Sequence, residues 1–219
     1  MKAPATVPVA LIVVRTRMAR PLTPPLWWLA AFVFTLLTGA TAYPSFRQCD
    51  PLWGADEMGT PGAGERSTIC GEGCAMTCLA MVLAGWGVVR VGPVSADPKT
   101  FDPKTLNVWL EANAGYTCAS GDCNNLVLDA PSRINASVVL VGELPPPPPS
   151  DIAAGLASGR TAYLAHVVAL HHFVLLTGLA PGSAPTDGRY TVLDPLYNAT
   201  EYGWRAFGDI IMYTLAAAQ

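Results

Sequence analysis

The chain has 219 residues, of which 51% are hydrophobic and 13% are charged, and its formal net charge is −3. This acidic balance excludes a protein that binds nucleic acid or an anionic membrane through a basic surface. The apolar content is sufficient for a sizeable core.

The first 42 residues have the pattern of a secretory signal peptide. Basic residues precede an apolar run from Leu26 to Leu37, which ends in the small-residue cleavage pattern Gly39-Ala-Thr-Ala42. We expect cleavage before Tyr43. Met18 is a second candidate start, because it gives a more compact signal. An uncleaved anchor is the alternative, but the apolar run is shorter than the roughly 20 residues that a spanning helix usually needs.

Residues 43–219 are expected to form one domain. All 16 acidic residues but only 9 of the 13 basic residues lie in this part, which gives it a formal charge of −7. Two acceptor sequons, at Asn135 and Asn198, predict N-glycosylation. We therefore expect a glycoprotein that is secreted or resides in the lumen of the secretory or endolysosomal pathway, with no membrane association after cleavage and no nucleic-acid partner.

The segment Tyr43–Gly54 is predicted to be extended, with Pro51 and Gly54 closing it. Gln48 is its notable polar residue. A Gln in such a segment is usually a solvated side chain. A carboxamide N–H is also what a developing oxyanion needs in acyl-transfer chemistry.

A helix is predicted to begin at Cys74, after the glycine-rich stretch that follows Thr68. Apolar residues recur at helical spacing from Met76 to Leu83, until Gly85 ends the pattern. A thiol at a helix start faces unpaired N–H groups and the positive end of the helix dipole, which favour the thiolate. Cys74 is therefore a candidate nucleophile, although a half-cystine or a buried small apolar residue is the alternative.

The middle of the chain alternates predicted helices and loops. Asp102-Pro103 provides an N-cap and a favourable first residue for a helix through Leu110. The spacing of Cys118 and Cys123 around Gly121 predicts a small disulfide loop. Residues 138–141 form a β-like run. Residues 145–149 are five prolines, which predict a stiff, extended connector. Ser150 is expected to cap a further helix.

The last third has a β character. Residues 161–169, 172–178 and 189–194 are apolar, β-favouring runs, and the turn-rich segment 180–188 predicts adjacent antiparallel strands. Residues 202–213 are expected to add another strand or helix. The predicted fold class is therefore α+β, with a helical N-terminal half, an antiparallel sheet in the C-terminal half and a cleft where they meet.

Three residues are expected to converge in that cleft. His172 begins one predicted strand and Asp194 ends the next, so antiparallel pairing brings them to the same sheet edge, and Cys74 on the opposing helix completes the set. A histidine is needed to take the thiol proton and to protonate the leaving group, and a carboxylate orients the imidazole.

Other histidines and aspartates are weaker candidates for these roles. His171 is expected on the opposite face of the strand from its neighbour, and His166 lies in an apolar run, so both are expected to be packed or solvent-facing. Asp187 and Asp209 end no strand that is expected to lie beside His172.

Several blocks in this order resemble the C39-like peptidase domain, a member of the papain-like superfamily. They are Gln48-Cys-Asp-Pro-Leu-Trp-Gly54, Gly73-Cys-Ala-Met-Thr-Cys-Leu-Ala-Met-Val-Leu83, Leu106-Asn-Val-Trp-Leu110, His172-Phe-Val-Leu-Leu-Thr-Gly178 and Val192-Leu-Asp-Pro195. The resemblance covers most of residues 43–219. It implies a papain-like fold with Cys74 as nucleophile, His172 as base, Asp194 as orienting group and Gln48 as oxyanion donor.

A free Cys74 leaves five other cysteines, so one of these must also be unpaired. We expect it to be Cys78, one helical turn further along the same helix and in an apolar stretch. The other four allow three pairings, and we favour Cys118 with Cys123 by proximity and Cys49 with Cys70, because a working Gln48 must lie near Cys74. A metal site formed by Cys70, Cys74 and Cys78 is disfavoured, because their spacing is not a usual zinc pattern.

The sequence thus predicts a secreted, monomeric cysteine peptidase that needs no cofactor or metal and cleaves an amide bond in a peptide or protein substrate. Two alternatives remain open. One is a catalytically inactive glycoprotein that uses the fold to bind a ligand or partner. The other is an acyltransferase that uses the same residues and differs only in the group that attacks the thioester.

Overall fold

The computed structural model describes residues 43–88 and 102–217. The predicted signal peptide, its alternative start at Met18 and its cleavage site lie outside the described residues. The helices of the described part are α2 (Ile69–Glu72), α3 (Cys74–Gly85), α4 (Pro103–Ala112), α5 (Ala130–Ile134) and α6 (Pro149–Ser158). None of them has the length and hydropathy that a membrane-spanning helix requires.

A six-stranded antiparallel sheet is the largest element of the described residues, and its strand order is β5-β10-β6-β7-β8-β9. Two short hairpins, β1-β2 and β3-β4, lie outside it. The strands are β1 (Glu57–Met58), β2 (Ser67–Thr68), β3 (Tyr116–Ala119), β4 (Asp122–Leu126), β5 (Val138–Leu144), β6 (Thr161–Val167), β7 (His172–Leu179), β8 (Arg189–Leu193), β9 (Glu201–Gly203) and β10 (Phe207–Leu215).

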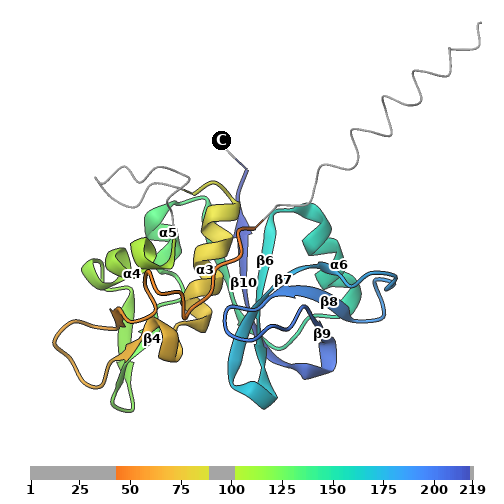
Figure 1. Cartoon of the computed structure of the whole chain (residues 1–219). Coiled ribbons are helices and arrows are strands. Elements are labelled where there is room, and N and C mark those ends of the chain that lie inside the picture. Colours follow the sequence, from red (N-terminus) through yellow and green to blue (C-terminus); the bar gives the residue numbers. More distant parts are fainter. Residues whose placement is uncertain (1–42, 89–101, 218–219) are drawn as a thin grey trace, which may run out of the picture. The chain divides into compact units, whose positions relative to one another are not determined.

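Helices α3 and α6 cover opposite faces of the sheet (Figure 1). On β7, Leu175 packs with the buried residues of α3, whereas its neighbours Val174 and Leu176 pack in the cluster beneath α6. This alternation follows from the two-residue period of a strand. The central strands are consequently apolar on both faces, as the continuous apolar runs in their sequences require.

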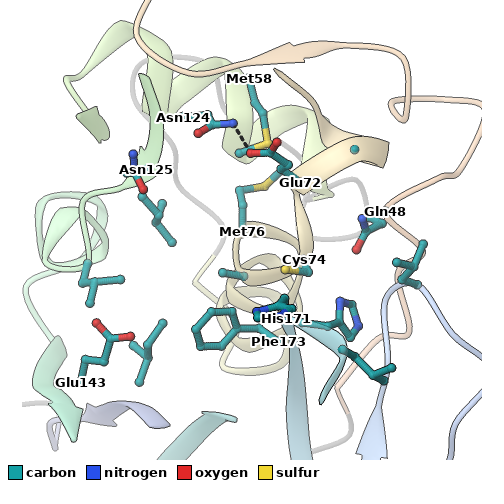
Figure 2. A pocket seen from close by; sticks show the side chains of 18 of the residues that line it. Gln48, Met58, Glu72, Cys74, Met76, Asn124, Asn125, Glu143, His171 and Phe173 are labelled. Carbon is teal, nitrogen blue, oxygen red and sulfur yellow. Dashed lines mark hydrogen bonds between the residues drawn. The ribbon is translucent and has the colours of Figure 1, made fainter. Parts of the chain in front are cut away.

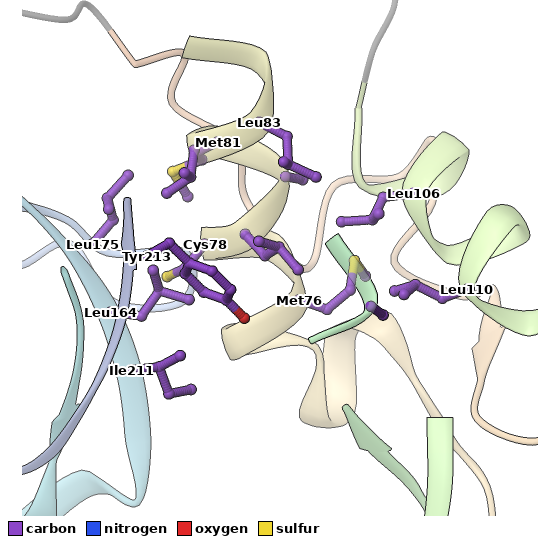
Figure 3. Packing of buried hydrophobic residues seen from close by; sticks show 14 of the residues in the cluster. Met76, Cys78, Met81, Leu83, Leu106, Leu110, Leu164, Leu175, Ile211 and Tyr213 are labelled. Carbon is purple, nitrogen blue, oxygen red and sulfur yellow. The ribbon is translucent and has the colours of Figure 1, made fainter. Parts of the chain in front are cut away.

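Helix α3 is the central element of the larger core (Figure 3). All its residues from Met76 to Leu83 are buried, because the sheet packs on one side and α4 on the other. Tyr213 of β10 is fully buried beside it and donates a hydrogen bond of 2.8 Å from its hydroxyl to the Leu128 carbonyl. A helix held on several sides provides a rigid support for its own first residue, Cys74.

The α+β class is confirmed, but the division into two halves is only approximate. Strand β5 precedes helix α6 in the chain, yet it joins the sheet as an edge strand beside β10, which itself inserts between β5 and β6. The pair β3-β4 around the predicted disulfide loop is a further early hairpin. Pairing between strands distant in sequence produces this order, and local sequence patterns do not encode it.

Two local predictions need correction. Ser150 does not cap α6, because the helix begins at Pro149 and its N-cap residue, Pro148, makes no side-chain capping bond. The prolines pre-set a helical φ at this position, so a side-chain cap is unnecessary. The segment from Tyr43 is not extended throughout, since turns follow Arg47 and the Asp50 carbonyl accepts hydrogen bonds from the N–H groups of Trp53 and Gly54.

Candidate active site

Cys74 is the first residue of α3, as the sequence predicts, and it is free and half-buried. Helix α2 ends immediately before it, and Gly73 makes the turn between the two helices. A Cβ at Gly73 would lie 2.4 Å from the Ile69 carbonyl oxygen, so this tight connection requires glycine. The first N–H groups of α3 have no partner within the helix, and the positive end of its dipole lies at Cys74.

His172 and Asp194 meet where two neighbouring strands end. His172 is the first residue of β7, Asp194 directly follows β8, and the two strands pair antiparallel. The imidazole Nε2 lies 2.8 Å from Asp194 Oδ1, and the two side chains are 3% and 0% exposed. A buried pair of this kind fixes the orientation of the ring.

Asp194 is held by more than the imidazole. Its Oδ1 also accepts hydrogen bonds from the N–H groups of Leu196 and Tyr197, at 2.9 and 2.8 Å, and its Oδ2 accepts one from the Tyr202 hydroxyl at 3.1 Å. Burial alone would raise the pKa of Asp194, but the hydrogen bonds from His172 and these two N–H groups lower it below its ordinary value. The residue is therefore a carboxylate at neutral pH.

His172 carries a proton at neutral pH. Burial lowers its pKa, but hydrogen bonds to Asp194 and Cys74, together with the charges of these two groups, outweigh burial and raise the pKa to about 9. The ring is also held by Tyr197, which packs edge-on against it with the ring centroids 5.2 Å apart. The imidazole thus connects Asp194 on one side with the Cys74 thiol on the other.

Gln48 is 1% exposed and lies beside the same site. Its backbone N–H donates to the Pro195 carbonyl at 2.9 Å, and its Nε2 donates to the Cys70 carbonyl at 2.7 Å. That bond uses one of the two hydrogens on Nε2 and leaves the other. The Oε1 atom is buried and has no hydrogen-bond partner within residues 43–88 and 102–217.

Two connections hold the Gln48 segment in place. The disulfide between Cys49 and Cys70 ties it to α2, just ahead of Cys74. On its other side Arg47 reaches across to the segment that follows β8 and donates hydrogen bonds to the carbonyls of Asp194, Leu196 and Tyr197. Residues far apart in the sequence are therefore fixed around one point.

These residues open onto a cavity of about 670 Å³ (Figure 2). Gln48, Cys74 and His172 line one part of it. The rest of the wall is apolar side chains with a few polar ones, among them Met58, Glu72, Met76, Asn124, Asn125, Leu126, Leu128, Glu143, Phe173 and Ile211. The Cys74 thiol therefore has space beside it for a bound molecule.

The cysteine predictions are confirmed by the structure. Disulfides join Cys49 to Cys70 and Cys118 to Cys123, and the two thiols of α3 are free. Cys78 is fully buried and its thiol donates to the Phe173 carbonyl at 3.5 Å. Burial, with smaller contributions from Cys74 and Asp194, raises the pKa of Cys78 well above its ordinary value, so it is an inert thiol.

Among the described residues, none of the weaker candidates makes a hydrogen bond to the side chain of His172 or Asp194. His166 packs against Phe173 with the ring centroids 5.0 Å apart, and Asp187 accepts a hydrogen bond from the Ala184 N–H within the loop after β7. Asp209 is exposed on β10. His171 was expected on a strand, but it precedes β7 in a left-handed conformation with φ 47°, exposed at the cavity.

Some residues around the site carry no signal in the sequence. Arg47, Tyr202 and Glu143 belong to no recognisable motif. The only sequence signal beside them is Gln48, which is adjacent to Arg47.

Of the two sequon residues, Asn198 is exposed and Asn135 is half-buried. The Oδ1 atom of Asn135 accepts a hydrogen bond from the Ser137 N–H. Within the described residues, no group of His, Cys, Asp and Glu side chains is placed to hold a metal ion.

Comparison of the chain with known protein families, with curated protein sequences and with solved structures finds no match.

Proposed function

We propose that the protein is a cysteine peptidase with a papain-like arrangement, in which Cys74 attacks a peptide carbonyl. The observation that carries this proposal is the buried His172, which interacts with Asp194 on one side and with the free thiol at the start of α3 on the other. The order Gln48, Cys74, His172, Asp194 along the chain supports the papain-like assignment, as does the α+β architecture.

The reaction uses these groups in two stages. His172 takes the Cys74 proton, and the thiolate sulfur attacks the carbonyl carbon. The C–N bond then breaks as His172 gives that proton to the leaving amine, which leaves a thioester on Cys74. His172 then takes a proton from water as the water oxygen attacks the thioester carbonyl, and the C–S bond breaks to release the acid. Asp194 keeps the imidazole oriented throughout and stabilises its charged form.

Gln48 stabilises the oxyanion that develops in both stages. Its Nε2 is fixed by the bond to Cys70, and the second hydrogen on that nitrogen remains for the substrate oxygen. The unpaired N–H groups at the start of α3 point to the same region as the Cys74 thiol. A donor fixed before the substrate binds costs no reorganisation during the reaction.

The cellular location belongs to the same proposal. Two disulfides fit an oxidising compartment, which is consistent with the predicted signal peptide and with the two sequons. The substrate is then a peptide or protein of the secretory pathway or of the exterior.

A peptide-cleavage assay tests the proposal. The mature protein is incubated with a library of quenched-fluorescent peptides, and products are identified by mass spectrometry. We expect cleavage by wild type and no cleavage by Cys74→Ser or His172→Ala. Cys78→Ser is the matched control, since it removes the other free thiol of α3 and should retain cleavage. Equal cleavage by wild type and Cys74→Ser would exclude this nucleophile.

A further inference from the structure

The cavity beside Cys74 is chemically asymmetric. Phe173, Met76 and Ile211 give it apolar walls, whereas two glutamates and two histidines also line it. None of the described residues that line it is Lys or Arg. The Glu72 carboxylate accepts a hydrogen bond from Asn124 at 2.5 Å, but that of Glu143 has no hydrogen-bond or ion-pair partner among the described residues.

A β-bulge turns Glu143 towards this cavity. Tyr213 of β10 pairs with Leu140 of β5, but the next residue, Met212, pairs with Gly142, so one residue of β5 is passed over. Gly142 has φ 150°, a conformation that L side chains rarely adopt. Simple alternation from the inward-facing Leu140 would have placed Glu143 on the outer face of the strand.

With the bulge, Glu143 pairs with Ile211 and shares its face of the sheet. Ile211 is buried and lines the cavity, so the carboxylate is brought to the cavity wall. In the view of Figure 2, Glu143 and Gln48 lie on opposite sides of the cavity. An edge strand thereby supplies a carboxylate to the cavity that Cys74 also lines.

The buried Gln48 oxygen independently indicates that the cavity receives a ligand. Gln48 is 1% exposed and lines the cavity, and its Oε1 has no hydrogen-bond partner in the part of the chain that the structure describes. Leaving a buried acceptor unpaired costs free energy, which a donor on a bound molecule recovers. A peptide backbone N–H is such a donor.

The geometry points to a subsite that takes a lysine or arginine side chain of the peptide substrate, with Glu143 binding its cationic end. The methylene groups of such a side chain pack along Phe173, Met76 and Ile211, and its charge meets the Glu143 carboxylate, which has no partner among the described residues. This inference rests on the proposed peptidase function and adds the class of substrate. Glu143 determines specificity and takes no part in bond cleavage.

Peptides that differ in one side chain test the inference. We would use quenched-fluorescent alanine-based peptides in which each position in turn carries Lys, norleucine or Glu, because norleucine has the length of Lys without its charge. At one position, wild type should cleave the Lys peptide with a kcat/KM roughly tenfold above the norleucine peptide, the scale of one charge-assisted hydrogen bond. Glu143→Gln should abolish the difference, and Glu143→Lys should shift the preference to Glu.

Glu65→Gln is the matched control, since it makes the same change at an exposed residue that does not line the cavity, and its Lys preference should be that of wild type. A Lys to norleucine ratio near one in wild type, or an unchanged ratio in Glu143→Gln, would overturn the inference while leaving the peptidase function intact.

A binding measurement tests the subsite even if the protein shows no peptidase activity. Fluorescence anisotropy with Cys74→Ala and the same peptides, labelled, measures the subsite without turnover. Tighter binding of the Lys peptide than of the norleucine peptide, lost in Glu143→Gln, supports the subsite even if wild type cleaves nothing. Equal binding of the two peptides refutes the subsite.

Discussion

At the scale of single residues, the charge of His172 decides what the site can do. Its imidazole is more than 90% inaccessible to solvent, which would ordinarily favour the neutral ring, yet Asp194 and Cys74 hold the proton on it. In the proposed mechanism, a protonated histidine has the leaving-group proton ready before the substrate arrives. Asp194 holds that proton on the imidazole and touches no substrate.

NMR titration of the histidine side chains measures this directly. The His172 ring should titrate with a midpoint at about 9, against an ordinary value of 6.5. Asp194→Asn should lower the midpoint, because the charge and part of the hydrogen bonding are lost, and should reduce kcat by orders of magnitude with the fold retained. A wild-type midpoint near 6.5 would contradict the proposed interaction.

Gln48 should contribute to turnover but not to the reactivity of the thiol. Gln48→Ala is expected to lower kcat by roughly 10² to 10³, the typical effect of removing one oxyanion donor. Alkylation of Cys74 by iodoacetamide forms no oxyanion, so its rate should change little. Gln48→Glu is the matched variant, since it keeps the shape and replaces the Nε2 donor with an oxygen. Full turnover in both variants would show that other hydrogen-bond donors stabilise the oxyanion.

At the scale of elements, the Cys49–Cys70 disulfide positions the Gln48 segment against α2. The pair Cys49→Ala and Cys70→Ala should lower the free energy of unfolding by about 3 kcal/mol for a loop of this length. Removing Cys118–Cys123, which closes a shorter loop, should cost about 2 kcal/mol. Only the first removal should also lower kcat.

Urea unfolding and peptide cleavage, measured on both double variants, test this difference. The Cys118–Cys123 variant is the control, because it removes a disulfide from a hairpin that does not hold Gln48. Equal effects of the two changes on kcat would show that the first disulfide contributes stability alone.

Sequence patterns predicted the elements whose signals are local. The helix from Cys74 follows from the spacing of its apolar residues. The helix at Pro103 follows from Asp102, whose side chain caps it by accepting a hydrogen bond from the Thr105 N–H. The last strands follow from β-favouring runs. His172 and Asp194 could be paired in advance because they stand at the ends of neighbouring antiparallel strands.

Contacts without a local signal could not be predicted. The insertion of β10 between β5 and β6 depends on pairing between distant strands, and the bulge that turns Glu143 inward is visible only in the register. Folding likewise brings Arg47 to the three carbonyls that it binds. It also brings the Tyr202 hydroxyl to the Asp194 carboxylate.

At the scale of the described domain, Asp194 joins parts that are distant in sequence. It binds His172, two N–H groups of the segment after β8 and the Tyr202 hydroxyl, and its own carbonyl accepts from Arg47. A buried carboxylate with so many donors stabilises the folded state only while it is ionised. The stability of the domain should therefore depend on its titration.

Because the pKa of Asp194 is lower in the folded state than in the unfolded chain, the unfolded state takes up the proton first as the pH falls. The stabilisation is present above the ordinary value of 3.8 and is lost as the pH falls through the folded-state pKa. Urea unfolding below about pH 4 should show a steeper loss of stability in wild type than in Asp194→Asn. Parallel curves for the two proteins would contradict this role.

Alkylation of Cys74 tests the central claim most directly. The mature protein is treated with iodoacetamide over a range of pH, and the labelled cysteine is identified by mass spectrometry. The account predicts rapid labelling of Cys74 at neutral pH, because the thiol lies at the start of α3 and beside the His172 imidazole. It also predicts much slower labelling in His172→Ala and no labelling of the buried Cys78. Absence of Cys74 labelling at neutral pH, or a labelling rate that is unchanged in His172→Ala, would contradict the account.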